Sequence, residues 1–173
     1  SSERCLSSTT QIVTRYFIAV WLSGLVYQID DLSFHSFLRY FVMQDLLEQI
    51  RNCTLCAEHL PLGPRPVIRA HRSSRILVIG QAPGTRVHET GIPWNDPSGK
   101  NLRKWMGVTD EQFYDSGLFA IVPMGFCYPG KGKSGDLPPR PECAAEWHER
   151  LLAKMPNIEL RTRIIFKLRR RQI

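Results

Sequence analysis

The apolar residues of the chain fall into two short continuous runs, separated by stretches in which they recur at helical spacing. The first run, Ile76–Ile79, is flanked by an arginine and a glycine, and such a run is typical of a strand buried on both faces of a parallel sheet. Leu118–Met124 is a second run of this kind. Pro83 and Gly84 predict a tight turn shortly after the first strand. Open α/β sheets bind ligands beside the carboxyl ends of their strands, so this turn is a candidate site, although an ordinary strand-to-loop junction also explains it.

Helical spacing predicts helices on either side of these strands. The expected helices cover residues 43–51, 99–106, 110–115 and 143–155. The last of them follows Pro141, and proline is tolerated in the first turn of a helix. Thr85–Lys100 and Gly125–Pro141 are rich in glycine and proline and are expected to be long loops.

The order of these elements, helix, strand, helix, strand and helix, predicts an α/β layered fold. Two strands are fewer than the roughly four to six that a sheet usually has. Either Val67-Ile68 and Ile164–Phe166 add edge strands, or part of the sheet is missing from the chain. No G-x-G-x-x-G motif follows the first strand, which excludes a dinucleotide fingerprint there.

Residues 1–42 differ in their residue pattern from those that follow. Tyr16–Ile29 is largely apolar but shorter than the roughly 20 residues that a bilayer requires. It is compatible with an amphipathic or buried helix, with a signal-peptide core that lacks an A-x-A-like cleavage site, or with a non-native extension ahead of Met43. The sequence is therefore divided into a leader (1–42), a domain (43–160) and a basic tail (161–173).

The composition is that of a soluble globular protein, with 43% apolar and 23% charged residues among 173. The formal net charge is +7, and a basic excess favours polyanionic partners, nucleic acids first. Residues 161–173 carry six basic residues and no acidic one, so the rest of the chain has a net charge of only +1. This tail is expected to raise affinity for any nucleic acid without adding base specificity, or to be merely a solvated end.

Five cysteines and no clear secretory signal argue against a disulfide framework and favour a cytoplasmic location. Cys53 and Cys56 form a C-x-x-C pair, and Cys127 and Cys143 follow in segments rich in proline and glycine. Four thiolates that converge would suit a zinc ion or an iron–sulfur cluster. The alternative is four unlinked thiols, because cysteine is among the most buried residue types. Cys5 lies in the leader and is left over.

The order and spacing of five motifs resemble those of the uracil-DNA glycosylase superfamily, closest to its iron–sulfur branches, families four and five. The motifs are C-T-L-C, V-I-G-Q-A-P-G, G-I-P-W-N-D-P-S-G, F-C-Y-P-G and P-E-C, from Cys53 to about Leu152. The resemblance implies a three-layer α/β sandwich with a short, mostly parallel sheet, without the C-terminal part of the family domain. It also implies a 4Fe–4S cluster on the four cysteines, with zinc as the alternative, and an enzyme that flips uracil out of DNA and hydrolyses its N-glycosidic bond.

Carried onto this chain, the resemblance implies a uracil pocket at the end of the first strand. The backbone amides of Gly80, Gln81 and Ala82 would lie near the base, together with the turn that follows them. Trp94 would stack on the base, since aromatic rings bind any base face. The alternative for Trp94 is an aromatic side chain that packs its own loop.

Asp96, Ser98 and Gly99 match the D-x-S-G motif of family five, whose aspartate positions the attacking water. The chemistry needs a carboxylate there, because bond cleavage builds positive charge on the sugar. Asp96 also suits the N-cap of a helix, and the two roles are compatible. Ser98 and Lys100 would then bind DNA phosphate at the helix start.

Several positions depart from the family pattern. Gln81 stands where family four has a catalytic glutamate, and Ala82 where another branch has a catalytic aspartate. Pro123 occupies the place of an asparagine that reads the uracil edge. The late histidine motif that stabilises the uracil anion is absent, and His148 does not match it. Because the loss of one such donor costs about 10²–10³ in rate, weak or no uracil excision is expected.

Two other functions stay open on the sequence. One is a DNA-binding module stabilised by an iron–sulfur cluster or zinc, without turnover, which the missing asparagine and histidine favour. The other is a nucleotide-binding α/β domain with a structural zinc, which would be colourless when purified. If the protein is a glycosylase, its expected partner is uracil-containing DNA. It is then expected to be a monomer without a membrane partner.

Overall fold

The structure is a computed structural model of the chain and describes residues 31–163. The chain divides into two units at Asp45, inside helix α2 (Asp31–Arg51). The helix predicted over residues 43–51 is the C-terminal part of α2, and most of the predicted leader, Tyr16–Ile29 included, lies outside the described residues. No helix between residues 31 and 163 is both long enough and apolar enough to cross a membrane.

The second unit is built around a three-stranded parallel sheet in the order β2-β1-β5. β1 (Ile76–Ile79) has the predicted bounds and pairs with β2 (Phe119–Ile121), which is shorter than the run that predicted it. Leu77 and Val78 of β1 are almost fully buried, as expected of a strand covered on both faces. The two apolar runs are therefore neighbouring parallel strands.

The third strand was not predicted as such. β5 (Leu160–Arg163) pairs with β1 along its whole length, so the segment assigned to a basic tail begins inside the sheet. Val67-Ile68 forms no strand, and next to it Arg69 makes one isolated antiparallel bridge with Ile121. Ile164–Phe166 lies outside the described residues.

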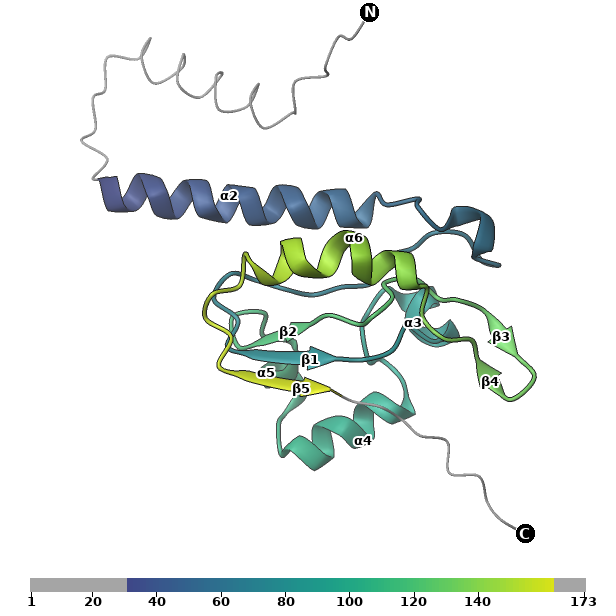
Figure 1. Cartoon of the computed structure of the whole chain (residues 1–173). Helices are drawn as coiled ribbons and strands as arrows, with labels where there is room; N and C mark the ends of the chain where they lie inside the picture. The colour runs from purple at the N-terminus through teal and green to yellow at the C-terminus, as the bar shows by residue number, and fades with distance from the viewer. Residues whose placement is uncertain (1–30, 164–173) are drawn as a thin grey trace, which may run out of the picture. The chain divides into compact units, whose positions relative to one another are not determined.

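Helices cover both faces of this sheet, which gives the expected three layers (Figure 1). α6 (Pro141–Leu152) lies over one face, and α4 (Pro97–Met106) and α5 (Asp110–Tyr114) lie on the other. α4 begins two residues before its predicted start, because the Asp96 side chain caps it. The α/β layered fold expected from the sequence is confirmed.

Two further elements lie in segments predicted to be loops. A short helix, α3 (Thr85–Thr90), follows the turn after β1 and ends at Gly91, whose φ of 70° is the left-handed conformation that glycine adopts readily. β3 (Lys131–Gly132) and β4 (Gly135–Asp136) pair as an antiparallel hairpin. Both elements lie at the carboxyl ends of the parallel strands (Figure 1).

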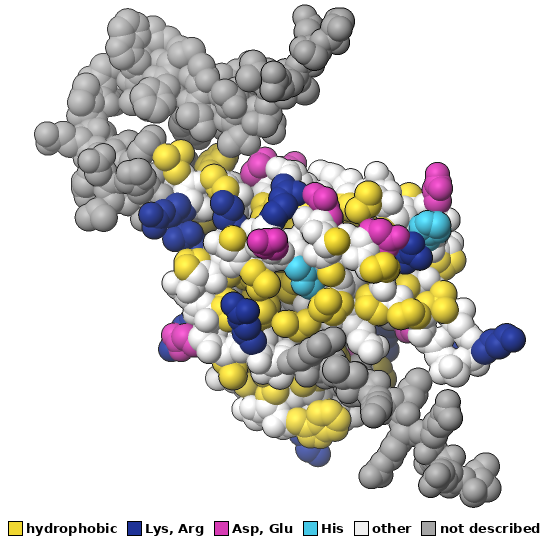
Figure 2. Space-filling model, viewed as in Figure 1, with side chains coloured by type: hydrophobic (Ala, Val, Ile, Leu, Met, Phe, Trp, Pro, Cys, Tyr) yellow, Lys and Arg dark blue, Asp and Glu magenta, His cyan; other side chains and the backbone are white. Residues whose placement is uncertain are grey.

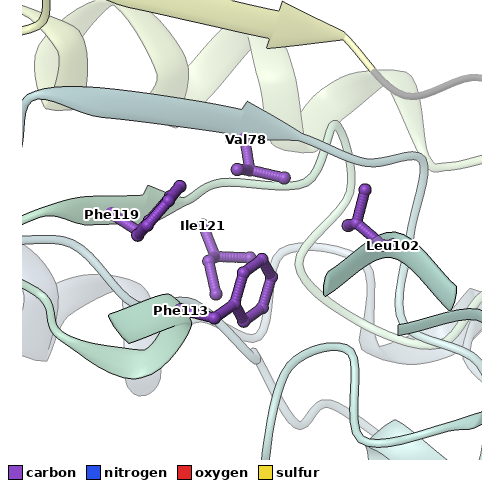
Figure 3. Close-up of a cluster of buried hydrophobic side chains, with 5 residues drawn as sticks. All are labelled: Val78, Leu102, Phe113, Phe119 and Ile121. Atoms are coloured by element: carbon purple, nitrogen blue, oxygen red, sulfur yellow. The ribbon is translucent and has the colours of Figure 1, made fainter. Parts of the chain in front are cut away.

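A compact apolar cluster joins the sheet to α4 and α5 (Figure 3). Its buried members are Val78, Leu102, Phe113, Phe119 and Ile121. The rings of Phe113 and Phe119 lie 5.6 Å apart between centroids, within the range of favourable aromatic pairs. This packing fixes α4, and therefore the loop that precedes it, against the ends of β1 and β2.

Candidate functional site

A cavity of about 190 Å³ lies at the carboxyl ends of β1 and β2. Its walls come from the turn after β1, the loop before α4, the residues after β2 and the β3–β4 hairpin. The lining residues that matter below are Gly80, Gln81, Ala82, Pro83, Gly84, Trp94, Asp96, Ser98, Pro123 and Asp136. The residues predicted to share one pocket, Gly80–Gly84, Trp94 and Asp96, all line this cavity. Ser98 lines it as well, whereas Lys100, predicted with Ser98 to contact DNA phosphate, is exposed on α4.

Trp94 forms one wall of the cavity in an uncommon backbone conformation. Its φ is 58°, and among the described residues it is the only non-glycine with a positive φ. The indole lies against the backbone at Gly80, because an ideal Cβ there would come 3.1 Å from its Cζ2 atom. Such a left-handed residue costs on the order of 1–3 kcal/mol and persists only where its surroundings hold it.

Arg103 and Tyr114 hold the backbone at Trp94. The guanidinium Nη1 of Arg103 donates to the Trp94 carbonyl (3.2 Å), and the Tyr114 hydroxyl donates to the Pro93 carbonyl (3.0 Å). Arg103 is itself buried and its Nε donates to Asp110 Oδ1 (2.6 Å). Burial raises the pKa of Tyr114, so its hydroxyl keeps the proton that it donates. Two adjacent carbonyls are thus held from α4 and α5.

Asp96 caps α4 and lines the cavity at the same time. Its Oδ1 accepts hydrogen bonds from the backbone N–H of Gly99 (2.7 Å) and from the Ser98 hydroxyl (2.7 Å). These bonds fix the orientation of a half-buried carboxylate. The geometry is compatible with both predicted roles, since only one of the two carboxylate oxygens takes part in the cap.

The loop after β2 closes the cavity without offering donors to it. The N–H groups of Met124 and Gly125 donate to the carbonyls of Gly80 and Gln81, both at 2.9 Å. Pro123, which lines the cavity, has no N–H. This side of the cavity is therefore tied to the turn after β1 by hydrogen bonds that a ligand cannot share.

His148 supports this loop from α6 and does not line the cavity. Its Nε2 lies 3.0 Å from the Pro123 carbonyl, and its ring stacks on Phe126 at an angle of 8°. Burial lowers the pKa of His148, which favours the neutral imidazole, and a neutral ring with its proton on Nε2 donates to Pro123. No histidine lines the cavity among residues 31–163.

Asp136 is a charged lining residue that the sequence did not predict. It lies in β4, inside the segment expected to be a loop, and its Oδ2 would be 3.5 Å from a Cβ built on Gly84. The available signal was the pair of glycines, Gly132 and Gly135, that flank Lys133-Ser134, since glycine is frequent in turns. Only the hairpin brings this carboxylate to the cavity.

The four cysteines of the domain line a second, smaller cavity together with Arg140. Cys53 and Cys56 lie between α2 and the short 3-10 helix Ala57–His59, Cys127 follows β2, and Cys143 lies in the first turn of α6. All four are free thiols. As the side chains stand, no group of three His, Cys, Asp or Glu residues in the described part of the chain is arranged to hold a metal ion.

Burial keeps the Cys127 and Cys143 thiols protonated in the absence of a metal. It raises the pKa of Cys127 to about 11 and that of Cys143 to about 12. The backbone N–H of Phe126 donates to the Cys143 sulfur (3.3 Å), a bond that favours the thiolate but does not outweigh burial. A metal bound here would have to displace these protons, so its affinity would fall at low pH.

Residues 69–169 match the family model of the uracil DNA glycosylase superfamily. The match covers more than half of the chain and includes all five strands, α3 to α6 and every residue named above as lining the larger cavity. It extends into the segment predicted to be a basic tail, and it begins after Cys53 and Cys56.

Proposed function

Since the chain belongs to the uracil-DNA glycosylase superfamily, we propose that it takes a uracil flipped out of DNA into the cavity beside β1 and hydrolyses its N-glycosidic bond. The observation that supports this most directly is that Trp94 and Asp96 line the same cavity. They supply a flat surface for a base and a carboxylate for the sugar to which the base is bonded.

The base must leave the duplex before reaction, because its glycosidic carbon is inaccessible in the stack. In the cavity it stacks on the indole of Trp94, whose position is held by Arg103. The N–H groups of Gln81 and Ala82 donate to no backbone carbonyl within residues 31–163, and both residues line the cavity, so these N–H groups are the donors available to the uracil oxygens.

Asp96 positions the water in this proposal. The water oxygen attacks C1′ of the sugar, the C1′–N1 bond breaks with its electron pair on uracil, and a water proton passes to the carboxylate. Ser98 and the N–H of Gly99 hold Oδ1 of Asp96, which leaves Oδ2 for the water. Excision is expected to be slow, because Pro123 offers no donor to the uracil anion.

Single-turnover excision from a uracil-containing oligonucleotide, single- and double-stranded, tests the proposal, with thymine in place of uracil as the control. We expect slow release of uracil that Asp96→Asn abolishes. Binding of the uracil strand without release, in the wild type, would instead support a DNA-binding module without turnover, the function that Pro123 favours.

We further propose that Cys53, Cys56, Cys127 and Cys143 hold an iron–sulfur cluster of the 4Fe–4S type. The donor set supports it: four thiols from three segments line one cavity and form no disulfide, and all-thiolate ligation is typical of such clusters. The cluster would supply a structural cross-link between the segment after α2, the loop after β2 and the start of α6. Zinc on the same four thiolates is the alternative.

A further inference from the structure

The β3–β4 hairpin brings charged groups to the cavity that the proposed reaction has not yet used. Asp136 lines the cavity from β4, yet its carboxylate makes no hydrogen bond or ion pair within residues 31–163. It is exposed, whereas Pro83 and Pro123 of the same lining are buried. Asp136 therefore lies at the mouth of the cavity, where a carboxylate stays charged without a protein partner.

Two lysines accompany this carboxylate on the same hairpin. Lys131 stands directly opposite Asp136 in the antiparallel register, and Lys133 lies in the turn between the strands. Both are exposed, and neither makes an ion pair within the described residues. Figure 2 shows a basic side chain standing out from the surface where the hairpin projects.

Because Asp136 lies at the mouth of the cavity and the two lysines lie on the same hairpin, their position determines which part of a bound nucleotide they contact. When a base enters a closed cavity, its sugar remains at the rim and its phosphates stay outside, because they continue into the DNA strand. A carboxylate at the rim therefore faces the sugar, and the exposed lysines beside it and in the turn of the hairpin can reach the backbone phosphates. The arrangement of charges along the hairpin matches the arrangement of charges along a flipped nucleotide.

We propose that the β3–β4 hairpin is a DNA-contacting element in which Lys131 and Lys133 bind the backbone phosphates and Asp136 is a second catalytic carboxylate, facing the sugar. This proposal rests on the proposed function. As the C1′–N1 bond breaks, its electron pair leaves with uracil and positive charge develops on the sugar ring. Asp136 stabilises that charge electrostatically, while the water proton passes to Asp96 as before.

The sugar-side role is tested by binding, without any need for turnover. One oligonucleotide carries a pyrrolidine abasic analogue, whose ring nitrogen is cationic, and a second carries the neutral tetrahydrofuran analogue. We expect the wild type to prefer the cationic ring, and Asp136→Asn to lower that preference by about tenfold without weakening binding of the neutral analogue. Asp115→Asn, which removes a charge outside the cavity, is the control and should leave the preference unchanged.

An unchanged preference in Asp136→Asn would overturn the sugar-side assignment. A different result would refute the proposed function itself: a wild-type protein that binds both abasic analogues no better than unmodified DNA. Asp136 is exposed, so Asp136→Asn is expected to fold, and an unchanged melting temperature would show that it does.

The phosphate-side role is tested by the salt dependence of binding. For unmodified single-stranded DNA, Lys133→Ala should reduce the slope of log K against log salt by about 0.7. Lys154→Ala is the control, since Lys154 follows α6 at the amino ends of the strands. Equal slopes for Lys133→Ala and the wild type would show that the hairpin does not bind phosphate.

Discussion

The carbonyl oxygen of Trp94 occupies the place where a side chain at Gly99 would begin. An ideal Cβ built on Gly99 would lie 1.8 Å from that oxygen, far closer than any real contact. The first turn of α4 can therefore pack against the left-handed turn at Trp94 only if residue 99 is a glycine. Through this contact, the cap formed by Asp96 and the wall formed by Trp94 are parts of one rigid unit.

Gly99→Ala is expected to destabilise this unit and to displace Trp94. The cost should be about 1–3 kcal/mol, because the atom in the way is backbone and cannot rotate aside. Chemical denaturation measures the loss of stability. Gly84→Ala is the matched control in the same cavity, since its Cβ would meet Asp136 at an ordinary 3.5 Å. Equal stabilities for the two variants would contradict the packing described for Gly99.

Trp94→Ala is expected to weaken the binding of DNA that contains a uracil or an abasic site. Stacking contributes about 1–3 kcal/mol per base, so the dissociation constant should rise roughly 10- to 100-fold. Fluorescence anisotropy with a labelled oligonucleotide measures it. Trp105→Ala removes an indole that is 70% exposed on α4 and does not line the cavity, and it serves as the comparison. A larger loss in Trp105→Ala would place the stacking surface elsewhere.

Cys143→Ser is expected to remove the metal centre and to destabilise the domain. Protein purified without oxygen should contain about four irons and four sulfides, absorb visible light and lose both properties in the variant. Cys5→Ser should retain them, because Cys5 belongs to none of the cysteine motifs and lies in the predicted leader. Stoichiometric zinc in a colourless protein would identify zinc as the bound metal. A metal-free wild type would refute the proposed metal centre altogether.

His148 is expected to make stability depend on pH below about 6.5. Burial lowers the pKa of His148 in the folded protein below that of the unfolded chain, which is about 6.5. The unfolded chain then binds more protons in this range, so the free energy of unfolding falls as the pH falls through it. In His148→Gln the side-chain amide can still donate to Pro123 but does not titrate, so the dependence should flatten. Denaturant midpoints between pH 5 and pH 8 measure the effect, and parallel curves for the two proteins would show that another group is responsible.

Local patterns in the sequence were sufficient for the elements whose cause is local. Four consecutive apolar residues specify the buried strand Ile76–Ile79, since a strand covered on both faces excludes polar side chains. Asp96 and Pro141 mark the starts of α4 and α6, because a cap and a first-turn proline depend only on nearby residues. The order of short motifs was likewise sufficient for the superfamily.

The remaining features depend on partners distant in the chain, and no local pattern carries them. Leu160–Arg163 alternates apolar and basic residues only weakly, and becomes a strand because β1 has an open edge whose N–H and C=O groups need partners. In the sequence, Arg103 is indistinguishable from any other basic residue of a helix. Only the tertiary structure shows that it hydrogen-bonds to Asp110 and to the Trp94 carbonyl. Asp136 reaches the cavity because a hairpin folds back on a strand end more than fifty residues earlier in the sequence. Spacing along the chain predicts local structure such as strands and helix caps. The contacts that build this site form only when the sheet has assembled.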